Sequence, residues 1–585
     1  MSGKIKLWAV GTLTVLAVLA PLKFGTPVVL SATVLPPQTI WEWVFFSWPN
    51  QLLTLVAAAE VVELALDAQW LPVRRDWLWV LPGLFLATQL AAVPTSICMA
   101  TTVETVLHFG VCVAVFYLAA RYVREPAAVA WVFGGLTVAT LVIVAFAVQQ
   151  RCGGLAATRE YAAVYGGEVP KDLQLRLTSN RVFGTLVYPN ALAGYLVVAF
   201  APVLAWLWSC RLRGWLKWGT LLGGGGLMVF GLALTGSRGG FIAFAVMVVS
   251  GLVAASRRAW LTLAAVAVIA VVFVTAQQMG LIRHGLASAS ARGDYWRGAV
   301  AIARDHPWLG TGPGTFGSIY PKYKTATTEE AQLVHNSYLQ MGSDSGVAGA
   351  VVFALLWLVA VRDGFKLARR QGGDVAGVAV LAATTGWVVH GFLDFDLYVP
   401  GVAVPAFLML GVLQGLKPVP DRPARRPARL ARGTAGIALG VVVAWLAGRS
   451  LLADFCNART QRLAGSDPVA ATASARQAIG FNPVNPRYQL LAGDLAFQQG
   501  HAAEAVEFYR AAVGTDPYRA AYHWRFARAL LMVAGREVEA VEQLQIAVGL
   551  NPMQERYRTE LAAIEEKIRQ VPAGLLNSQP IDKRR

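Results

Sequence analysis

Charged residues are scarce in this 585-residue chain, since Asp, Glu, Lys and Arg together make up only 15% of it. Hydrophobic residues make up 56%, so too little polar surface remains to cover a water-soluble fold of this size. Cysteines are also few: the five stand singly, with no CxxC spacing and no histidine pairing in a ligand pattern. The sequence therefore predicts neither a disulfide framework nor a metal site.

Long apolar runs are what the chain has in abundance, and its mean hydropathy is +0.50. These runs approach or exceed the roughly 20 residues that a helix needs to cross a bilayer. We predict thirteen membrane-spanning helices, at 6–22, 51–69, 77–96, 103–120, 127–149, 183–208, 218–236, 240–256, 260–278, 337–361, 375–392, 399–416 and 434–451. A cleaved signal peptide is the alternative for the first run, because Lys4 and Lys6 precede a compact apolar core.

Basic residues give these predicted spans a direction. The net charge of +17 comes in short clusters between the apolar runs, and short loops rich in Lys and Arg stay in the cytoplasm. The clusters are Lys4/Lys6, Arg74/Arg75, Arg121/Arg124, Arg211/Arg213/Lys217, Arg257/Arg258, Arg362/Lys366/Arg369/Arg370 and residues 417–432. With thirteen crossings all of them fall on one face, which predicts a cytoplasmic N-terminus and an outer C-terminus. The same distribution argues against nucleic acid as a partner.

The last 130 or so residues change character and repeat. Pro483, Pro517 and Pro552 follow similar segments and stand 34 and 35 residues apart. Between them, small and aromatic residues fall where a tetratricopeptide repeat places them. Such helix pairs stack on their neighbours to bury their apolar faces. We therefore expect a short α-solenoid outside the membrane that serves as a docking surface; the alternative is a cap that only stabilises the membrane part.

Arg238 lies in a predicted hairpin between two spans, at the outer surface. Gly236, Gly239 and Gly240 surround it and allow a tight turn close to a ligand. A guanidinium there suits an anion such as a phosphate, which it can bind with two parallel hydrogen bonds. The alternative is an arginine that reaches toward lipid headgroups, but the charge rule makes an arginine on the outer face less expected.

The predicted outer loop 279–335 carries a second group of polar residues. Arg292 and Trp296 are four residues apart and so share one face of a predicted helix, with Arg297 beside them. The GTGPG sequence that follows is a turn and not a phosphate-binding P-loop, because no Lys-Ser/Thr follows it. The loop ends at His335 and Asn336, directly before a long apolar run.

Together and in this order, the polar segments resemble the family of O-antigen ligases and related O-antigen polymerases. The matching stretches are YPNALAGYL at 188–196, TGSRGG at 235–240, RGDYW at 292–296 followed by HPWLGTGPGTF, HNSYLQMGSDSGVAG at 335–349 and HGFLDFDLYVP at 390–400. The resemblance is best over roughly 180–415, and the last stretch is similar to the branch with C-terminal tetratricopeptide repeats. Asp344 departs from the family, which more often has Glu there.

The resemblance implies a membrane glycosyltransferase that uses a polyprenyl-diphosphate-linked glycan outside the cytoplasmic membrane. Its acceptor would be lipid A–core, a growing polysaccharide or a protein, and neither a cofactor nor a metal is implied. By position, Arg238 and Arg292 match the family's essential arginines, and His335 matches its essential histidine. We expect further substrate contacts from Asn336, Arg297, Asn190, His390 and Asp394.

The chemistry of these residue types agrees with the roles that the resemblance implies. Arginines can compensate the growing charge on a diphosphate leaving group without a metal. An imidazole that titrates near neutral pH suits the base that the acceptor hydroxyl needs. In this interpretation His335 caps a helix at the membrane boundary; the alternative is a helix-capping histidine with no catalytic role, with Asn336 bonding the backbone.

The expected fold is all-α: a polytopic membrane protein of about thirteen transmembrane helices, similar to GT-C glycosyltransferases, with a periplasmic repeat domain. Its parts would be N-terminal spans at 1–180, a ligase-like core at 181–451 and the repeats at 452–585. The expected location is the bacterial inner membrane, with a possible protein partner on the repeats. A flippase or transporter and a non-catalytic scaffold are the alternatives of another class, and the sequence leaves ligase, polymerase and protein glycosyltransferase open.

Overall fold

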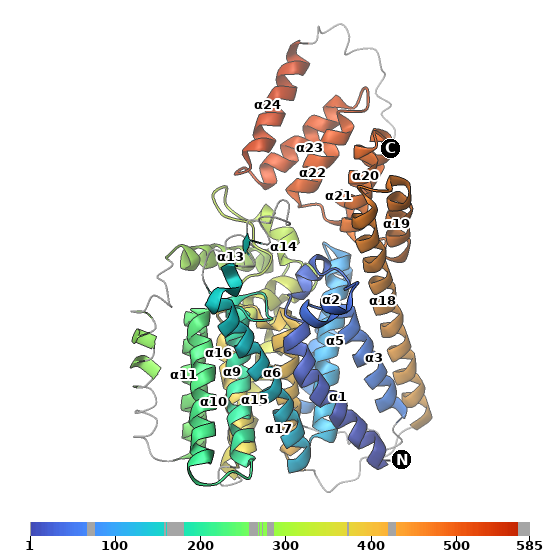
Figure 1. Ribbon diagram of the computed structural model, residues 1–585. Helices are drawn as coiled ribbons and strands as arrows, with labels where there is room; N and C mark the ends of the chain where they lie inside the picture. Colours follow the sequence, from blue (N-terminus) through green and yellow to red (C-terminus); the bar gives the residue numbers. More distant parts are fainter. Residues whose placement is uncertain are drawn as a thin grey trace. The chain divides into compact units, whose positions relative to one another are not determined.

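The structure is a computed structural model. It describes residues 2–66, 76–156, 159–160, 181–256, 286–370, 374–418 and 429–570, with scattered positions between 267 and 277. All regular secondary structure in these residues is helical, as predicted (Figure 1). The predicted span 260–278 lies largely outside the described residues, and so do the basic clusters Arg74/Arg75 and Arg257/Arg258.

The described chain is a multi-pass membrane protein, because nine of its helices are long and apolar enough to cross a bilayer. They are α1 (Ser2–Lys23), α4 (Trp77–Ala91) with η2 (Val93–Thr95), α5 (Met99–Tyr122), α6 (Pro126–Gln149) with η3 (Gln150–Gly154), α9 (Pro189–Ser209), α10 (Gly214–Thr235), α11 (Arg238–Ala255), α15 (Ser337–Arg370) and α18 (Arg429–Leu463). Each coincides with a predicted span.

Three further predicted spans form shorter helices of 17 residues each: α3 (Asn50–Leu66), α16 (Val375–Gly391) and α17 (Pro400–Leu416). The segment between α1 and α3 contains η1 (Val28–Thr33) and α2 (Ile40–Phe45). The described residues divide into two compact units. Unit 1 comprises Met1–Ser96, Thr101–Gly314 and Leu333–Leu451; unit 2 comprises Ile97–Ala100, Thr315–Gln332 and Leu452–Arg585.

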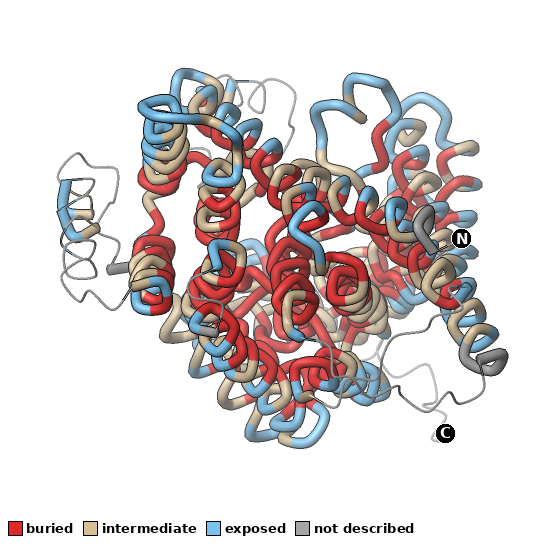
Figure 2. Tube along the Cα trace, turned by 90° about the horizontal axis from the view of Figure 1, so that it is seen from below, coloured by how far each residue is buried: buried red, intermediate tan, exposed pale blue. Residues whose placement is uncertain are grey.

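Helix α17 lies at the centre of unit 1, and all of its residues from Pro400 to Gly415 are buried. A helix that is apolar on every side needs neighbours all round. Glycines let one of these neighbours approach closely: a Cβ on Gly411 would lie 2.6 Å from the carbonyl oxygen of Phe116 on α5. Small residues at such contacts are typical of helices packed in a membrane. Figure 2 shows that buried positions run along the inward sides of the helices.

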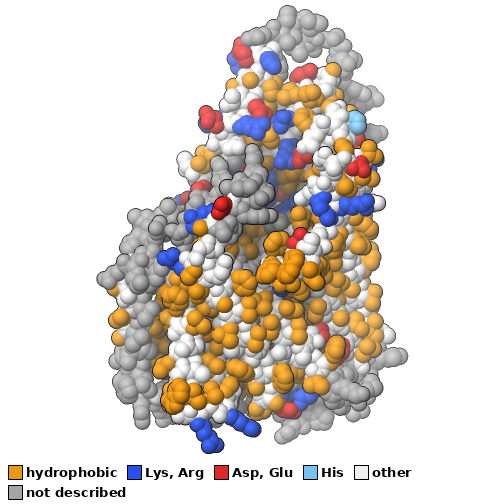
Figure 3. Space-filling model, viewed as in Figure 1, with side chains coloured by type: hydrophobic (Ala, Val, Ile, Leu, Met, Phe, Trp, Pro, Cys, Tyr) orange, Lys and Arg blue, Asp and Glu red, His pale blue; other side chains and the backbone are white. Residues whose placement is uncertain are grey.

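The outward faces of these helices are apolar as well. On α6, Trp131, Val138 and Leu141 are each more than half exposed. Hydrophobic side chains accordingly dominate the surface of the helices of unit 1 that Figure 3 presents. Exposed apolar side chains of this kind face lipid in a multi-pass protein.

Unit 2 is built from short helices in sequence: α19 (Pro468–Phe481), α20 (Pro486–Gln498), α21 (Ala502–Thr515), α22 (Ala520–Leu530), α23 (Glu537–Leu550) and α24 (Glu555–Gln570). Helix α20 packs on α21, and α22 packs on α23. Gly493 makes room for the ring of Tyr509, because a Cβ there would lie 2.7 Å from it. These positions are among those that the repeat pattern assigns to small and aromatic residues; the identification as tetratricopeptide repeats stays a prediction.

Unit 2 also contains a piece of the predicted outer loop. The segment 315–332 carries α14 (Phe316–Ile319) and η4 (Tyr320–Lys322). Asn551 donates a hydrogen bond of 2.9 Å to the Glu330 carboxylate, and Lys322 lies over the ring of Tyr518. The predicted boundaries put this segment in the membrane core, whereas its contacts group it with the repeats.

Candidate active site

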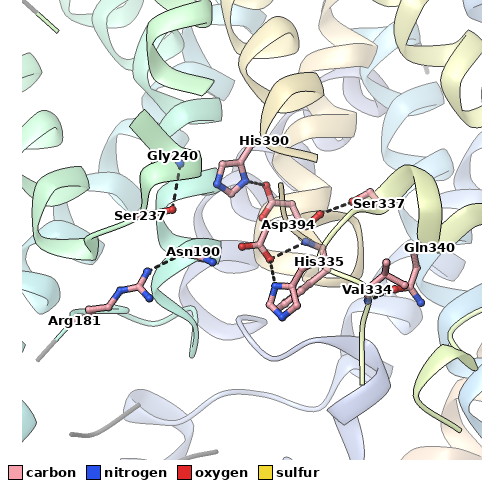
Figure 4. Close-up of polar contacts among 12 residues, drawn as sticks. Arg181, Asn190, Ser237, Gly240, Val334, His335, Ser337, Gln340, His390 and Asp394 are labelled. Carbon is pink, nitrogen blue, oxygen red and sulfur yellow. Dashed lines mark hydrogen bonds and ion pairs between the residues drawn. The ribbon is translucent and has the colours of Figure 1, made fainter. Parts of the chain in front are cut away.

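The candidate site forms where several helices of unit 1 begin or end. Helix α10 ends and α11 begins at the turn around Gly236, α16 ends and α17 begins around 391–399, and α9 and α15 start nearby. A Cβ on Gly239 would lie 3.2 Å from Leu393, and Ser337 donates a hydrogen bond to the carbonyl oxygen of Asp394. Residues that are far apart in the sequence therefore lie in one polar cluster (Figure 4).

His335 and Asp394 form the centre of this cluster, although they are 59 residues apart. The His335 Nδ1 atom lies 3.2 Å from Asp394 Oδ1, which also accepts a hydrogen bond from the Phe395 backbone N–H. An ionised carboxylate can only accept hydrogen bonds. The His335 Nδ1 atom therefore carries a hydrogen and donates the hydrogen bond to Asp394. That leaves the Nε2 atom of His335 as an acceptor on the other side of the ring.

Aromatic rings fix the plane of the His335 imidazole. The ring stacks on Tyr295 with centroids 6.1 Å apart and meets the edge of Phe395 at 4.6 Å. Its side chain remains 27% exposed, whereas that of Asp394 is 2% exposed. The geometry is that of an imidazole oriented from behind by a buried carboxylate and accessible from the front.

The backbone at His335 has a left-handed conformation, with φ of 56°. This region is sparsely populated by residues other than glycine, and such conformations occur at functional sites. The helix cap itself is Asn336: its Oδ1 atom accepts hydrogen bonds from the backbone N–H groups of Tyr338 and Leu339. The expectation that His335 caps the helix is therefore corrected, because the adjacent asparagine side chain fills that place and His335 turns toward Asp394.

His390 makes a second histidine–carboxylate pair, with Asp396. The Nδ1 atom of His390 lies 2.5 Å from Asp396 Oδ2, and both side chains are 1% exposed. Gly194 permits this arrangement, because a Cβ there would lie 2.3 Å from the same carboxylate oxygen. The two aspartates of the HGFLDFD stretch thus pair with different histidines: Asp394 with His335 and Asp396 with His390.

Asp394 and Asp396 have pKa values shifted in opposite directions. Burial works against ionisation of Asp394, but the hydrogen bond from His335, the charge of the His335 ring when it is protonated, and the charge of Arg292 hold its pKa well below the usual range. Burial raises the pKa of Asp396; pairing with His390 lowers it in part, and the Asp394 charge raises it further. Asp394 is therefore the firmly ionised carboxylate of the cluster.

Arg292 lies on α13 (Leu286–Asp305), the helix predicted for this part of the loop. Its charge acts on Asp394 and His390, so it belongs to the cluster. Arg297, one and a half turns further along, is 78% exposed and paired with Asp294. Arg292 is thus near enough to Asp394 for its charge to lower the pKa of that carboxylate, whereas Arg297 is exposed and paired with Asp294.

Arg238 is the first residue of α11 and is exposed. The Ser237 side chain caps this helix by accepting a hydrogen bond from the Gly240 N–H at 3.2 Å. The TGSRGG turn packs against the 391–396 turn through Gly239 and Leu393. Arg238 therefore stands at the edge of the cluster, on a turn that contacts it.

Arg181 was not among the predicted site residues and lies in the cluster. Its Nε donates to the carbonyl oxygen of Thr235 and its Nη2 to Asn190 Oδ1, each at 2.7 Å. The predicted site residue Asn190 is thus held by an arginine on the neighbouring loop. In the sequence Arg181 is one of several basic residues in the predicted outer loop before the span 183–208, where the charge rule makes basic residues less expected.

The GTGPG turn supports the start of α15 from the side. Helix α15 is kinked at Gly346, whose φ is 68°. The backbone N–H groups of Thr311 and Gly312 donate to the carbonyl oxygens of Ser343 and Asp344, which lie just before the kink. The carboxylate of Asp344 accepts from the Gly314 N–H at 2.8 Å and from Tyr398 at 2.7 Å. The turn therefore donates hydrogen bonds to carbonyl groups next to the kink in α15, and it holds the segment that follows His335 in place.

Within the described residues, no group of three His, Cys, Asp or Glu side chains is arranged to hold a metal ion. Residues 223–354 match a family model described as O-antigen ligase. The matched region contains Arg238, Arg292 and His335, and it ends before His390 and Asp394. A comparison with curated proteins finds no match.

Proposed function

We propose that this chain transfers a glycan from a polyprenyl-diphosphate carrier to an acceptor hydroxyl at the periplasmic face of the inner membrane; the match of residues 223–354 to the O-antigen ligase family model supports this. The observation that carries the proposal is the His335–Asp394 pair beside Arg292 at the start of α15. It combines a base and a compensating cation in one place, as this chemistry requires.

His335 acts as the general base in the proposed reaction. The acceptor oxygen attacks the anomeric carbon of the donor as the Nε2 atom of His335 takes the hydroxyl proton. The bond between that carbon and the diphosphate oxygen breaks, and the electron pair leaves with the diphosphate. Asp394 holds the ring in the required tautomer and stabilises the imidazolium that forms. The proton then passes to solvent, which restores the base.

Arg238 and Arg292 compensate the charge that develops on the leaving diphosphate. Both carry planar guanidinium groups that can bind phosphate oxygens in pairs. Helices α9, α11 and α15 all begin beside the cluster, and the positive ends of helices favour anions. In this proposal Asn190 contacts the donor, and the buried His390 and Asp394 support the site from behind. Neither a cofactor nor a metal is part of this mechanism.

The proposed orientation puts the N-terminus in the cytoplasm and both the site and unit 2 in the periplasm. It is supported by the basic clusters between the spans. Reporter fusions after residues 320 and 500 should both be active as periplasmic reporters and inactive as cytoplasmic ones. A cytoplasmic signal at either position would overturn the orientation and the location of the site.

Unit 2 is proposed to dock the acceptor or a protein partner, and the acceptor is lipid A–core, a growing polysaccharide or a protein. Deleting the gene and examining the surface glycans separates these acceptors. Loss of all long chains on lipid A indicates a ligase. Retention of single repeat units with loss of chain length indicates a polymerase. Loss of glycosylated protein indicates a protein glycosyltransferase.

The direct test is transfer from a lipid-diphosphate glycan by the purified full-length protein, with EDTA present. We expect transfer to persist in EDTA. Arg238→Lys and Arg292→Lys should raise the donor KM and lower kcat, because lysine lacks the planar fork. Arg304→Lys, on the exposed last turn of α13, is the matched control. Strict dependence on an added divalent metal, or full activity of both site variants, would overturn the mechanism.

A further inference from the structure

An apolar groove of about 500 Å³ lies between α1 and α3 of unit 1, both drawn in blue in Figure 1. One face of α1 and the first two turns of α3 line it, with side chains such as Leu7, Val15, Leu19, Leu52 and Val56. Leu7 and Val15 are 74% and 52% exposed, so the groove is open to the surrounding lipid. An apolar concavity that opens to a bilayer suits a hydrocarbon chain.

Both walls of the groove are held in place from behind. On the opposite face of α1, Leu13, Ala17 and Ala20 are fully buried, and the helix packs on α6 and α17. Helix α3 packs closely on α18, since a Cβ on Gly440 would lie 3.0 Å from the carbonyl oxygen of Ala58. The groove is therefore a preformed feature of the helix bundle.

The length of the groove decides which kind of hydrocarbon chain it fits. Leu7 and Phe24 both line it, and the distance between them along a helix axis is about 25 Å. The hydrocarbon core of a bilayer is about 30 Å thick, so an acyl chain that occupies one leaflet covers about 15 Å of it. The groove is longer than this. It fits a chain that extends from one leaflet into the other, as the long prenyl chain of a polyprenyl carrier can.

The Phe24 end of the groove adjoins elements of the candidate site. The Phe24 carbonyl oxygen accepts a hydrogen bond of 2.8 Å from the Gly401 N–H, and the Thr185 side chain donates to the last turn of α1 at 2.7 Å. Gly401 follows Asp396 by five residues. Thr185 precedes Asn190 by the same number. The two segments that hold this end of α1 therefore continue directly into the site.

Aromatic and basic side chains mark the depth of the same end. The Trp48 ring also lines the groove and meets the ring of Phe24 edge-on, with centroids 6.0 Å apart. The Lys23 ammonium group lies 5.6 Å above the Trp48 ring. Tryptophan and lysine at the end of a span are typical of the boundary between membrane and water. A chain in the groove would therefore have its head group at this boundary.

We propose that the groove between α1 and α3 binds the prenyl chain of the donor, so that the chain lies along α1 while its diphosphate lies at the candidate site. This inference rests on the proposed function and adds to it a subsite outside the matched residues 223–354. The chain is surrounded by lipid before it binds, so its affinity for the groove comes from close packing along its length. A short prenyl chain, which reaches only the part near Phe24, gains less of this packing.

The test compares the binding of undecaprenyl diphosphate and farnesyl diphosphate to the full-length protein in lipid nanodiscs. The wild type should bind the longer ligand more tightly. Gly11→Trp should reduce this preference by about 3-fold to 10-fold and leave farnesyl diphosphate binding nearly unchanged. Gly11 lines the groove, and no atom of the described residues lies within 4 Å of a Cβ placed on it, so an indole can fill the space.

Gly223→Trp is the matched control. This glycine lies in the span formed by α10, is exposed like Gly11, and has no neighbour among the described atoms within 4 Å of an added Cβ. It does not line the groove, so the variant should keep the full preference for the longer ligand.

The outcomes separate the groove from the proposed function. An unchanged preference in Gly11→Trp, or a wild type that binds both diphosphates equally, would overturn the inference and leave the diphosphate donor in place. Loss of a co-purified phospholipid from Gly11→Trp, with the preference unchanged, would show that the groove holds a bilayer lipid and would also overturn it. A wild type that binds neither diphosphate would contradict the proposed function itself.

Photolabelling of the wild type decides the question if Gly11→Trp does not fold. Undecaprenyl diphosphate with a diazirine at the far end of its chain should label the peptide that contains Leu7, and unlabelled undecaprenyl diphosphate should compete. Farnesyl diphosphate with the same group should label nearer to Phe24. Competed labelling that falls only on helices other than α1 and α3 would refute the inference.

Discussion

In unit 1 both side chains of the His390–Asp396 pair are 1% exposed, whereas in unit 2 the Arg476–Glu504 pair is 62% and 33% exposed. The cluster around His335 buries Asp394 and Asp396, whereas several ion pairs of the repeat helices, such as Arg510 with Glu507, are exposed. The Arg519–Asp516 pair of unit 2 is more buried, at 24% and 4% exposure.

The two arrangements differ in cost. Burying a charge requires that every partner be in place, and removing one partner leaves the other unpaired. An exposed pair forms and breaks in water at little cost and contributes between about 0 and 1 kcal/mol. We therefore expect the buried carboxylate–imidazole pairs of unit 1 to serve the proposed chemistry and the exposed charges of unit 2 to serve solubility and recognition. Substitutions of equal size should then have very different effects in the two units.

The largest effect is expected from His335→Ala, which removes the proposed base. The transfer rate should fall by about 10²-fold or more, with donor binding retained. His501→Ala in unit 2 is the matched control, because this histidine is 62% exposed and its contact with Glu504 is 3.9 Å long. Both variants are compared by kcat in the reconstituted transfer assay. Equal rates for the two variants would show that His335 matters no more for transfer than an exposed histidine of unit 2.

Asp394→Asn tests the buried partner of His335. The amide oxygen can still accept from the His335 Nδ1–H and from the Phe395 N–H, so the tautomer is kept and only the charge is lost. We expect kcat to fall by about 10-fold to 100-fold, since the imidazolium loses its counter-charge. The donor KM should change much less. A larger effect on KM than on kcat would show that Asp394 binds the donor and does not assist the base.

The effect of Asp394→Asn on stability should also depend on pH. The pKa of Asp394 is lowered in the folded protein, so this carboxylate contributes stability above the ordinary aspartate pKa of 3.8 and loses it as the pH falls through its folded value. Asp394→Asn should therefore lower the midpoint of thermal unfolding at neutral pH, and the difference from wild type should narrow only below about pH 4. A difference that is unchanged at pH 3 would contradict the shift.

The membrane-spanning helices could be predicted from the sequence because the ability to span a bilayer is a property of a local run of residues. Hydropathy predicts α15 and α5 to within a few residues at their starts or ends. His335 could also be found, since a histidine just before an apolar helix stands out locally. Its partner could not, because nothing in the neighbourhood of His335 specifies a residue 59 positions later.

Neither the contacts of Arg181 nor the role of the GTGPG turn could be predicted from the sequence, because both depend on residues that are distant in the chain. Arg181 matters through Thr235 and Asn190, which meet it only once α9 and α10 have packed. The turn looked like a simple connection because the carbonyl groups it satisfies appear only when α15 is kinked at Gly346. Assigning segment 315–332 to the membrane core had a similar cause, since sequence order says nothing about its contacts with Asn551.

Asn551→Ala is expected to have a smaller effect, confined to unit 2. It removes the hydrogen bond to Glu330 and so loosens segment 315–332 on the repeat helices. Trypsin cleavage after Lys322 or Lys324 should become about 2-fold to 10-fold faster, in keeping with one hydrogen bond to a charged group. This variant is sharper than deleting 470–570, because deletion removes the proposed docking surface together with the partners of the segment. Unchanged cleavage would show that the segment is held by other contacts.

The smallest effect should come from Arg476→Ala, which breaks an exposed ion pair of unit 2. Arg476 is 62% exposed, so water replaces the lost contact with Glu504, and the loss of unfolding free energy should stay below about 1 kcal/mol. The transfer rate should be unchanged, and raising the salt concentration should reduce even the small stability difference, because exposed pairs are screened. The informative measurement sets this variant beside Asp394→Asn in the same unfolding and transfer assays. If Arg476→Ala cost as much as Asp394→Asn in either assay, burial would not be what separates the two units, and the charges of the repeats would need a role of their own.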